Sequence, residues 1–266
     1  MGLGLGESRA PFARNPITAL FTTGVNGAWY DPSDFSTMFQ NAAGTTPVTA
    51  VGQPVGKILD KSGRGNHAYN PSGNSANFPV LQQDGTGRYY LAFNGVNQWL
   101  RSIGSIDLTY GDKMFVSAGV RKLSDAAIGS VVSISTAPTS SNGTFEIYTP
   151  QANGGDSHFW YSRGTAIAGA VAGPYAAPIT NVLSGIGDIS GNKSILRVNG
   201  TQVSTNYSTV QGAVNYGNYP LYVGARGGSS FFFNGRLYGL VVAGKAASAG
   251  EIASTEAWLN QKTGSY

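Results

Sequence analysis

The chain has 266 residues, of which 41% are hydrophobic and only 11% are charged, with 38 glycines and no cysteine. The missing cysteine excludes disulfides, thiolate metal sites and cysteine nucleophiles, and no apolar run approaches a membrane span in length. The formal net charge of +4 is spread along the chain. Neither a nucleic-acid track nor a membrane-binding patch is therefore indicated.

Residues 1–20 are glycine-rich and irregular, which predicts a flexible N-terminal arm. Two interpretations stay open for it: a disordered end, or a tether that docks on a partner protein. The opening lacks the basic region and long apolar core of a signal peptide. We therefore expect a protein that is made in a cytoplasm and not exported by a standard route, with residues 21–266 as one domain.

Short strands separated by turn residues dominate the first half. A strand at 27–31 is broken by a proline, and one helical turn is predicted at 34–39. The stretch 60–77 is dense in Gly, Ser and Asn and is predicted to be a loop. The remaining strands predicted in this half are 55–60, 89–93 and 99–102.

The second half is more regular, because each β-branched or aromatic run is bounded by Gly, Asn, Ser or Pro. Asn199-Gly200 predicts a type I′ hairpin turn, since both positions require positive φ. The predicted strands are 114–121, 130–135, 144–148, 158–162, 181–188, 194–198, 202–204, 221–225 and 235–242.

One helix is predicted at the C-terminal end. Ser248 and Glu251 fit a capping box, and Gly264 is placed to end the helix. Its apolar stripe is formed by Ile252, Thr255 and Leu259, flanked by Trp258. We expect this helix to close one end of a β-sandwich.

Six segments, in order along the chain, resemble signature segments of concanavalin A-like, laminin-G-type domains. They are 60–68 (DKSGRGNHA), 92–100 (AFNGVNQWL), 196–200 (LRVNG), 221–225 (LYVGA), 235–241 (GRLYGLV) and the capping box with Trp258-Leu259. The resemblance implies an all-β jelly-roll sandwich with a short C-terminal α-helix. It also implies core positions for Trp29, Trp99 and Trp258.

The segment 27–34 (GAWYDPSD), with the GLGLG start, is similar to proteins of tailed bacteriophages and prophages. This resemblance implies a virion protein, either a capsid decoration or head-fibre component or a tail-associated one. The implied partners are other virion proteins, bound through the N-terminal arm, and host surface glycan. A homo-oligomer is expected, although no heptad pattern specifies one.

Glycoside hydrolases share this fold, so catalysis needs a direct test. A retaining mechanism needs two carboxylates about 5 Å apart, and positions i and i+2 of a strand supply that spacing. Glu146 is the only Glu in a predicted strand and stands alone. We therefore predict no catalytic residues and no enzyme, with a glycosidase as the least favoured function.

The two histidines and the acidic residues near the N-terminus are assigned structural roles. His67 is predicted to stabilise its glycine-rich turn, and no G-x-S-x-G elbow supports a catalytic triad at His158. Asp31, Asp34 and Asp60 carry the oxygen ligands that calcium prefers. The family's acidic turn has become Asn94 and Asn97, however, so we predict no metal and no cofactor.

Glycan binding stays open at two aromatic–arginine segments, 159–163 and 226–233. Alternate residues of a strand face opposite sides, so Phe159 and Trp160 cannot share a face. The candidate glycan-binding residues are Trp160, Tyr161, Arg163 and Arg226, with simple packing as the alternative. The sequence thus predicts a virion structural protein built on a lectin-like jelly roll, or else a glycan-binding receptor module of a phage tail or fibre.

Overall fold

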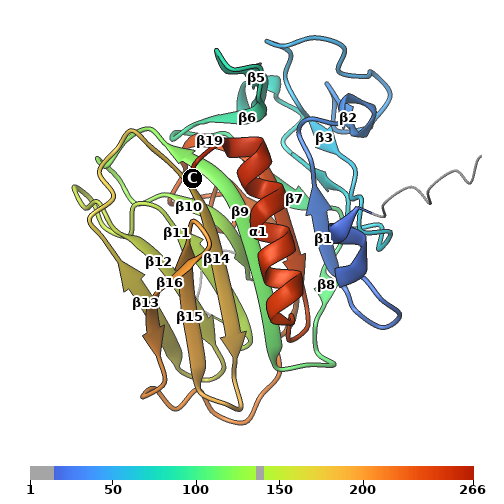
Figure 1. Ribbon diagram of the computed structural model, residues 1–266. Coiled ribbons are helices and arrows are strands. Elements are labelled where there is room, and N and C mark those ends of the chain that lie inside the picture. Colours follow the sequence, from blue (N-terminus) through green and yellow to red (C-terminus); the bar gives the residue numbers. More distant parts are fainter. Residues whose placement is uncertain (1–14, 136–140) are drawn as a thin grey trace, which may run out of the picture.

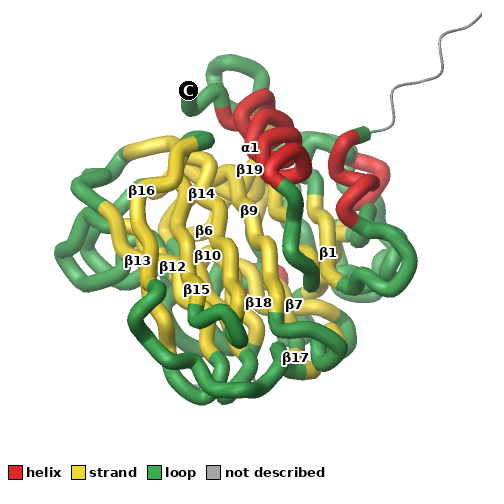
Figure 2. Tube along the Cα trace, turned by 60° about the horizontal axis from the view of Figure 1, so that its bottom comes forward, coloured by secondary structure: helices red, strands yellow, loops and turns green. Residues whose placement is uncertain are grey.

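The computed structural model describes residues 15–135 and 141–266, which form two antiparallel sheets packed face to face (Figures 1 and 2). Apolar side chains from both sheets fill the space between them, including Trp160, Phe145 and Leu183. This arrangement confirms the predicted all-β jelly-roll sandwich with one C-terminal α-helix.

The first sheet has eight strands. In spatial order they are β16 (Thr201–Asn206), β15 (Lys193–Val198), β14 (Ile179–Asp188), β9 (Lys113–Lys122), β19 (Asn234–Ala243), β6 (Tyr89–Asn94) and β5 (Val80–Gln83), with β1 (Gly27–Tyr30) paired to β19.

The second sheet has nine strands. In spatial order they are β13 (Ile167–Ala172), β12 (His158–Arg163), β11 (Thr144–Tyr148), β10 (Ser130–Ile134), β18 (Leu221–Val223), β7 (Leu100–Ser102), β4 (Ala68–Tyr69), β3 (Lys57–Ile58) and β2 (Met38–Phe39). The remaining elements are the pair β8 (Ile106–Asp107) and β17 (Asn218–Tyr219), and the short 3-10 helices η1 (Pro16–Leu20), η2 (Phe35–Thr37) and η3 (Ser75–Asn77).

The C-terminal helix α1 (Ala249–Thr263) begins with the predicted capping box and ends at Gly264, which has a left-handed φ of 59°. Its predicted position at one end of the sandwich is wrong. The helix lies along the outer face of the eight-stranded sheet, over β9, β14 and β19 (Figure 1). Glycine permits this approach: a Cβ on Gly119 would lie 2.7 Å from the Thr263 side chain and 3.4 Å from that of Leu259.

A second, smaller core forms beneath α1. Ile17 and Leu20 of η1 are fully buried there with Trp29, Phe115 and Trp258. Residues 16–20, which were assigned to the flexible arm, are therefore packed, because two apolar side chains of η1 reach this core. The rest of the predicted arm, residues 1–14, lies outside the described residues.

Most predicted strands are present with shifts of one or two residues, and Asn199-Gly200 has φ values of 50° and 78°, as a type I′ turn requires. Strand β13 was not predicted. Its sequence, IAGAVA, has three alanines and lacks aromatic residues. The predicted loop 60–77 contains β4 and η3. In the part of the chain described, none of the helices is both long and apolar enough to cross a membrane.

Candidate functional site

The outer face of the nine-stranded sheet carries a continuous row of residues, one from each strand. Neighbouring strands pair these residues directly, so the row crosses the whole sheet at right angles to the strands. We call it the cross-sheet row. Its members, from β13 to β2, are Gly169, Tyr161, Glu146, Ser133, Tyr222, Arg101, Tyr69, Lys57 and Phe39.

Glu146 lies in the β11 part of the row and is fully buried. Its Oε2 accepts hydrogen bonds from the Tyr148 hydroxyl at 2.7 Å and the Tyr161 hydroxyl at 3.2 Å, and lies 3.4 Å from Nε of Arg226. Burial, which disfavours the charged form, raises the pKa of Glu146 to about 7 despite these partners. The carboxyl group is thus a buried anchor with no solvent contact.

The loop between β18 and β19 covers this anchor. Arg226 reaches Glu146, and Phe231 packs edge-on against Tyr148 with ring centroids 5.9 Å apart. Phe231 adopts φ of 51°, which is uncommon for a bulky residue. At the loop tip, a Cβ on Gly228 would lie 2.7 Å from the Trp99 ring. The loop therefore crosses the middle of the outer face and leaves both flanks accessible.

The flank over β7, β4 and β3 combines aromatic rings with cations, and its four side chains are all half-buried. The guanidinium of Arg101 lies 5.7 Å from the centroid of the Tyr69 ring and donates to the Tyr69 hydroxyl at 3.2 Å. This hydrogen bond is the main cause of a raised pKa for Arg101. Trp99 packs against Tyr222, and Lys57 follows Tyr69 on the row.

The opposite flank, over β12 and β13, is more apolar. Phe159 stacks on Tyr148 with ring centroids 5.9 Å apart. It is paired across the strands with Val171, which is 48% exposed. Further along the same face, beyond the pair of Tyr161 and Gly169, Arg163 is paired with Ile167.

Of the four candidate glycan-binding residues, Trp160 does not lie on the surface. It is fully buried between the sheets, where it packs on Phe145. Tyr161 lies on the outer face but is only 3% exposed, because Glu146 holds its hydroxyl beneath the loop. Arg163 and Arg226 are half-buried on the outer face.

Trp99, expected in the core, lies half-buried on the outer face instead, because Leu100 takes the inward position next to it. Sequence analysis missed Tyr69, Arg101 and Lys57 as well. The usable signal was the alternation of Trp99, Leu100 and Arg101, which places the first and third residues on the same face.

His158 forms a polar chain that resembles a catalytic triad but has the wrong proton arrangement. The backbone N–H of Val182 donates to Oδ1 of Asn199, whose amide donates to Oδ1 of Asn181. The Asn181 amide therefore donates to Nε2 of His158, which assigns the ring proton to Nδ1, 2.7 Å from the Thr149 hydroxyl. Burial, aided by nearby Lys122, lowers the pKa of His158 to about 3. The imidazole cannot accept the threonine proton.

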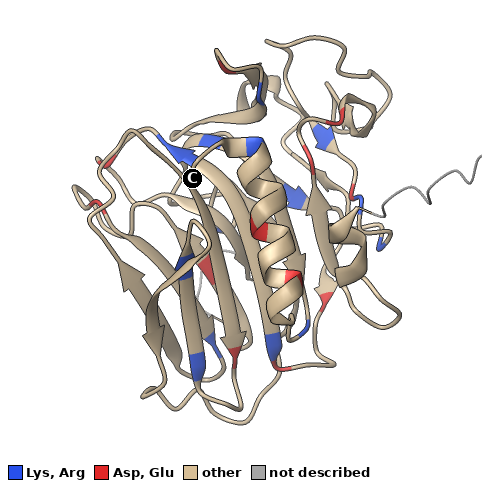
Figure 3. Cartoon of the chain, in the orientation of Figure 1, with Lys and Arg blue, Asp and Glu red and all other residues tan. Residues whose placement is uncertain are grey.

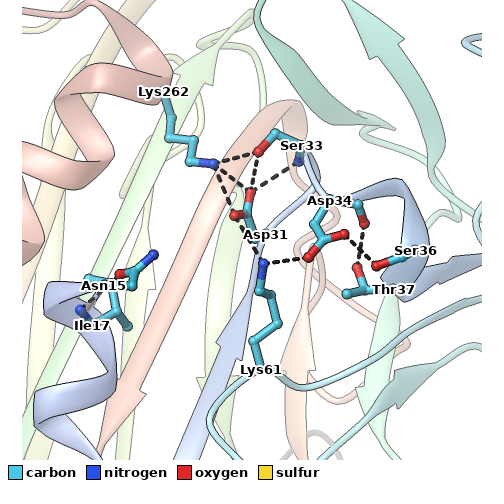
Figure 4. A network of polar contacts seen from close by, with 9 residues as sticks. All are labelled: Asn15, Ile17, Asp31, Ser33, Asp34, Ser36, Thr37, Lys61 and Lys262. Carbon is cyan, nitrogen blue, oxygen red and sulfur yellow. Dashed lines mark hydrogen bonds and ion pairs between the residues drawn. The ribbon is translucent and has the colours of Figure 1, made fainter. Parts of the chain in front are cut away.

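The residues considered for calcium are held by cations and backbone groups. Asp31 accepts hydrogen bonds from Lys262, and Asp34 from Lys61 (Figure 4). Asp60 accepts from the backbone N–H of Trp29, Ser62 and Asn66. No group of three or more metal-ligating side chains occurs among the described residues.

His67 stabilises its turn, as predicted. Its Nδ1 accepts a hydrogen bond from the backbone N–H of Asp60 at 3.0 Å. The conformation of the glycine-rich segment 60–68 thus depends on two side chains, Asp60 and His67, that bond to the local backbone.

Two cavities lie beside α1. The larger, about 390 Å³, is lined by Asn15, Pro16, Ser254, Ala257, Trp258 and Gln261 and contains no charged group. The smaller, about 180 Å³, includes Lys262, whose ammonium already donates to Asp31 and Ser33. The smaller cavity also contains Arg88 and Tyr89, so of these two cavities only the larger lacks the combination of an aromatic ring and a cation.

No protein-family model and no curated protein matches the chain. Among solved structures, the binding domains of botulinum neurotoxin serotype G and of botulinum neurotoxin DC in complex with SialylT each align with a TM-score of 0.53 over 76% of this chain, at 12% and 10% identity. The chain spans about half of those two domains, because the alignments cover 48% of each. The CBM40 of Ruminococcus gnavus IT-sialidase bound to alpha2,3 sialyllactose aligns over 55% of this chain and 82% of its own, at 16% identity and a TM-score of 0.43. At these identities, the likeness to the neurotoxin domains shows a shared lectin-like β-sandwich fold.

Proposed function

We propose that this chain is a glycan-binding module whose ligand lies on the outer face of the nine-stranded sheet, over β7, β4 and β3. The supporting observation is the accessible group of Trp99, Arg101, Tyr69 and Lys57 on that face. Sugar-binding sites need flat apolar surface for the ring and a few fixed polar groups for its hydroxyls. Aromatic faces provide the first, and the Tyr69 hydroxyl and Arg101 guanidinium provide the second.

The closed middle of the row gives this site a rigid wall. The Glu146–Arg226 contact and the packing of Gly228 on Trp99 hold the covering loop against the sheet. The ring of Trp99 is therefore positioned before a ligand arrives, which lowers the conformational entropy lost on binding.

Affinity electrophoresis against a panel of polysaccharides, backed by a glycan array, tests this proposal. Wild-type protein should be retarded by at least one polysaccharide, and Trp99→Ala and Tyr69→Ala should abolish the retardation. Tyr207→Ala is the matched control, because Tyr207 is 52% exposed and follows β16 of the other sheet. Equal loss in all three variants, or unchanged binding in both site variants, would contradict the proposal.

Binding without hydrolysis is the favoured activity. The partners of Glu146 are two tyrosines and an arginine, and the outward positions of β10 to β13 offer no second carboxylate among the described residues. An oligosaccharide incubated with the protein should stay intact. Turnover that Glu146→Gln abolishes would establish a glycosidase instead.

A place in a bacteriophage virion is the wider setting we propose, on the resemblance of segment 27–34 and of the chain start. In this setting the module is a structural or receptor-recognition part of a capsid, tail or fibre, docked through its N-terminal arm and assembled as a homo-oligomer. Mass spectrometry of purified particles, followed by electron microscopy, tests this setting. Absence of the chain from particles would contradict the proposed virion setting but not the proposed glycan binding.

A further inference from the structure

We propose that the ligand of this face is a polysaccharide that bears carboxylate groups, which Arg101 and Lys57 bind from adjacent parts of the cross-sheet row. This inference rests on the proposed glycan-binding function and specifies the chemical class of its ligand. It follows from the distribution of charge on the outer face, from the pairing of each cation and from the geometry around Arg101.

The outward positions of the nine strands, with the covering loop, carry four cations and one carboxylate, for a net charge of +3. The cations are Lys57, Arg101, Arg163 and Arg226, and the carboxylate is Glu146. The chain as a whole has a net charge of only +4, with charged side chains sparsely distributed (Figure 3). This face therefore carries a large share of the excess positive charge.

Six of the eleven cations that the structure describes elsewhere form an ion pair with Asp or Glu. They are Lys61, Lys113, Lys122, Arg197, Lys245 and Lys262. On the outer face, Arg226 is paired with Glu146, but no ion pair joins Lys57, Arg101 or Arg163 to a carboxylate within the described residues. Three positive charges on this face thus lack an anionic partner.

Arg101 is the residue best placed to receive a carboxylate. The Tyr69 ring and hydroxyl hold its guanidinium in position, so little side-chain entropy remains to be lost. A fixed guanidinium pairs with the planar carboxylate of a uronic or sialic acid through two parallel hydrogen bonds. Lys57, two strands away on the row, supplies a second charge for the next acidic sugar.

The test uses a panel of acidic and neutral polysaccharides, with each acidic member present in its native form and in a carboxyl-reduced form that keeps the sugar backbone. Wild-type protein should bind native acidic members and lose at least about tenfold in affinity on carboxyl reduction, as expected for the loss of a charge-assisted hydrogen-bonded pair. Binding should weaken between 50 and 500 mM salt (about 14 and 4 Å Debye length) because the charges are partly exposed.

Arg101→Gln and Lys57→Gln should each reduce affinity for the native acidic polysaccharide by a larger factor than they reduce affinity for its carboxyl-reduced form. Arg236→Gln is the matched control, because Arg236 also lies over a tyrosine ring, 4.6 Å from the centroid of Tyr90, but belongs to the eight-stranded sheet. Thermal unfolding of each variant checks that the fold is retained.

The outcomes separate the two proposals. Binding that favours neutral members, or that ignores carboxyl reduction, overturns the carboxylate inference and leaves glycan binding standing. Binding to no member of the panel overturns both.

Discussion

The outer face of the eight-stranded sheet is covered by α1 and η1, which bury Trp29, Phe115 and Trp258 in a second core. The outer face of the nine-stranded sheet is covered only in the middle, by one loop, and keeps aromatic and cationic side chains half-exposed on both flanks. Both outer faces carry aromatic side chains, but different elements cover them. The covered face stabilises the fold, and the open face is available to a ligand.

The covered face should be the more sensitive to truncation. Trp258 is 7% exposed and packs edge-on against Trp29 with ring centroids 5.7 Å apart. Trp258→Ala should lower the free energy of unfolding by about 3–5 kcal/mol, because it removes buried area and leaves a cavity under α1. Urea denaturation measures the loss, and Trp258→Phe should recover most of it. A loss below about 1 kcal/mol would mean that α1 contributes little to stability.

The ion pair that fastens α1 to β15 gives the next largest effect. Arg197 donates to both carboxylate oxygens of Glu256, at 2.8 and 3.0 Å, and the Glu256 side chain is only 3% exposed. Arg197→Met should cost about 2–3 kcal/mol by leaving a buried charge unpaired. Adding Glu256→Leu should restore stability, whereas a double variant as unstable as the single one would assign the loss to packing.

The loop on the open face should respond to pH through Glu146. Its folded pKa is about 7 against an ordinary value of 4.5. The folded state therefore binds the extra proton between those values, and stability falls as pH rises through this window, by up to about 3 kcal/mol. Glu146→Gln should abolish that slope and exceed wild-type stability at pH 8. If the free energies of unfolding of wild type and Glu146→Gln changed in parallel from pH 5 to 8, this assignment would be contradicted.

The smallest change in stability is expected on the open flank over β12. Phe159 is half-buried and stacks on Tyr148. Phe159→Ala should lower the free energy of unfolding by about 1 kcal/mol, because part of the ring is already solvated. Its buried neighbour gives the contrast: Trp160→Ala should cost about 3–5 kcal/mol. Similar losses in the two variants would show that the flank is as tightly packed as the core.

Local signals were sufficient for much of the fold. The Ser248–Glu251 capping box, the Asn199-Gly200 turn and the β-branched runs of the second half depend on neighbours within a few residues. Among the strands that these signals did not predict is β13, whose alanine- and glycine-rich sequence has weak strand propensity. It is a strand because β12 pairs with all six of its residues.

The candidate site was harder to predict, because alternation along a strand leaves open which face is buried. Sequence established that Phe159 and Trp160 lie on opposite faces, and packing against Phe145 placed Trp160 inside. For the same reason, the sequence did not reveal that Trp99 and Arg101 lie on the outer face. His158 could be assigned a tautomer only once Asn181 and Asn199 were in contact with each other.

The sequence by itself determined a strand-rich chain, a capped terminal helix and a scarcity of charge, since these depend on composition and on interactions between residues close in the chain. Tertiary structure alone decided that α1 covers one sheet, that a single loop covers the middle of the other, and that nine strands align the cross-sheet row. The physical reason is that register and layer order follow from burying apolar surface between segments distant in sequence, such as β4 and β7 or β10 and β18.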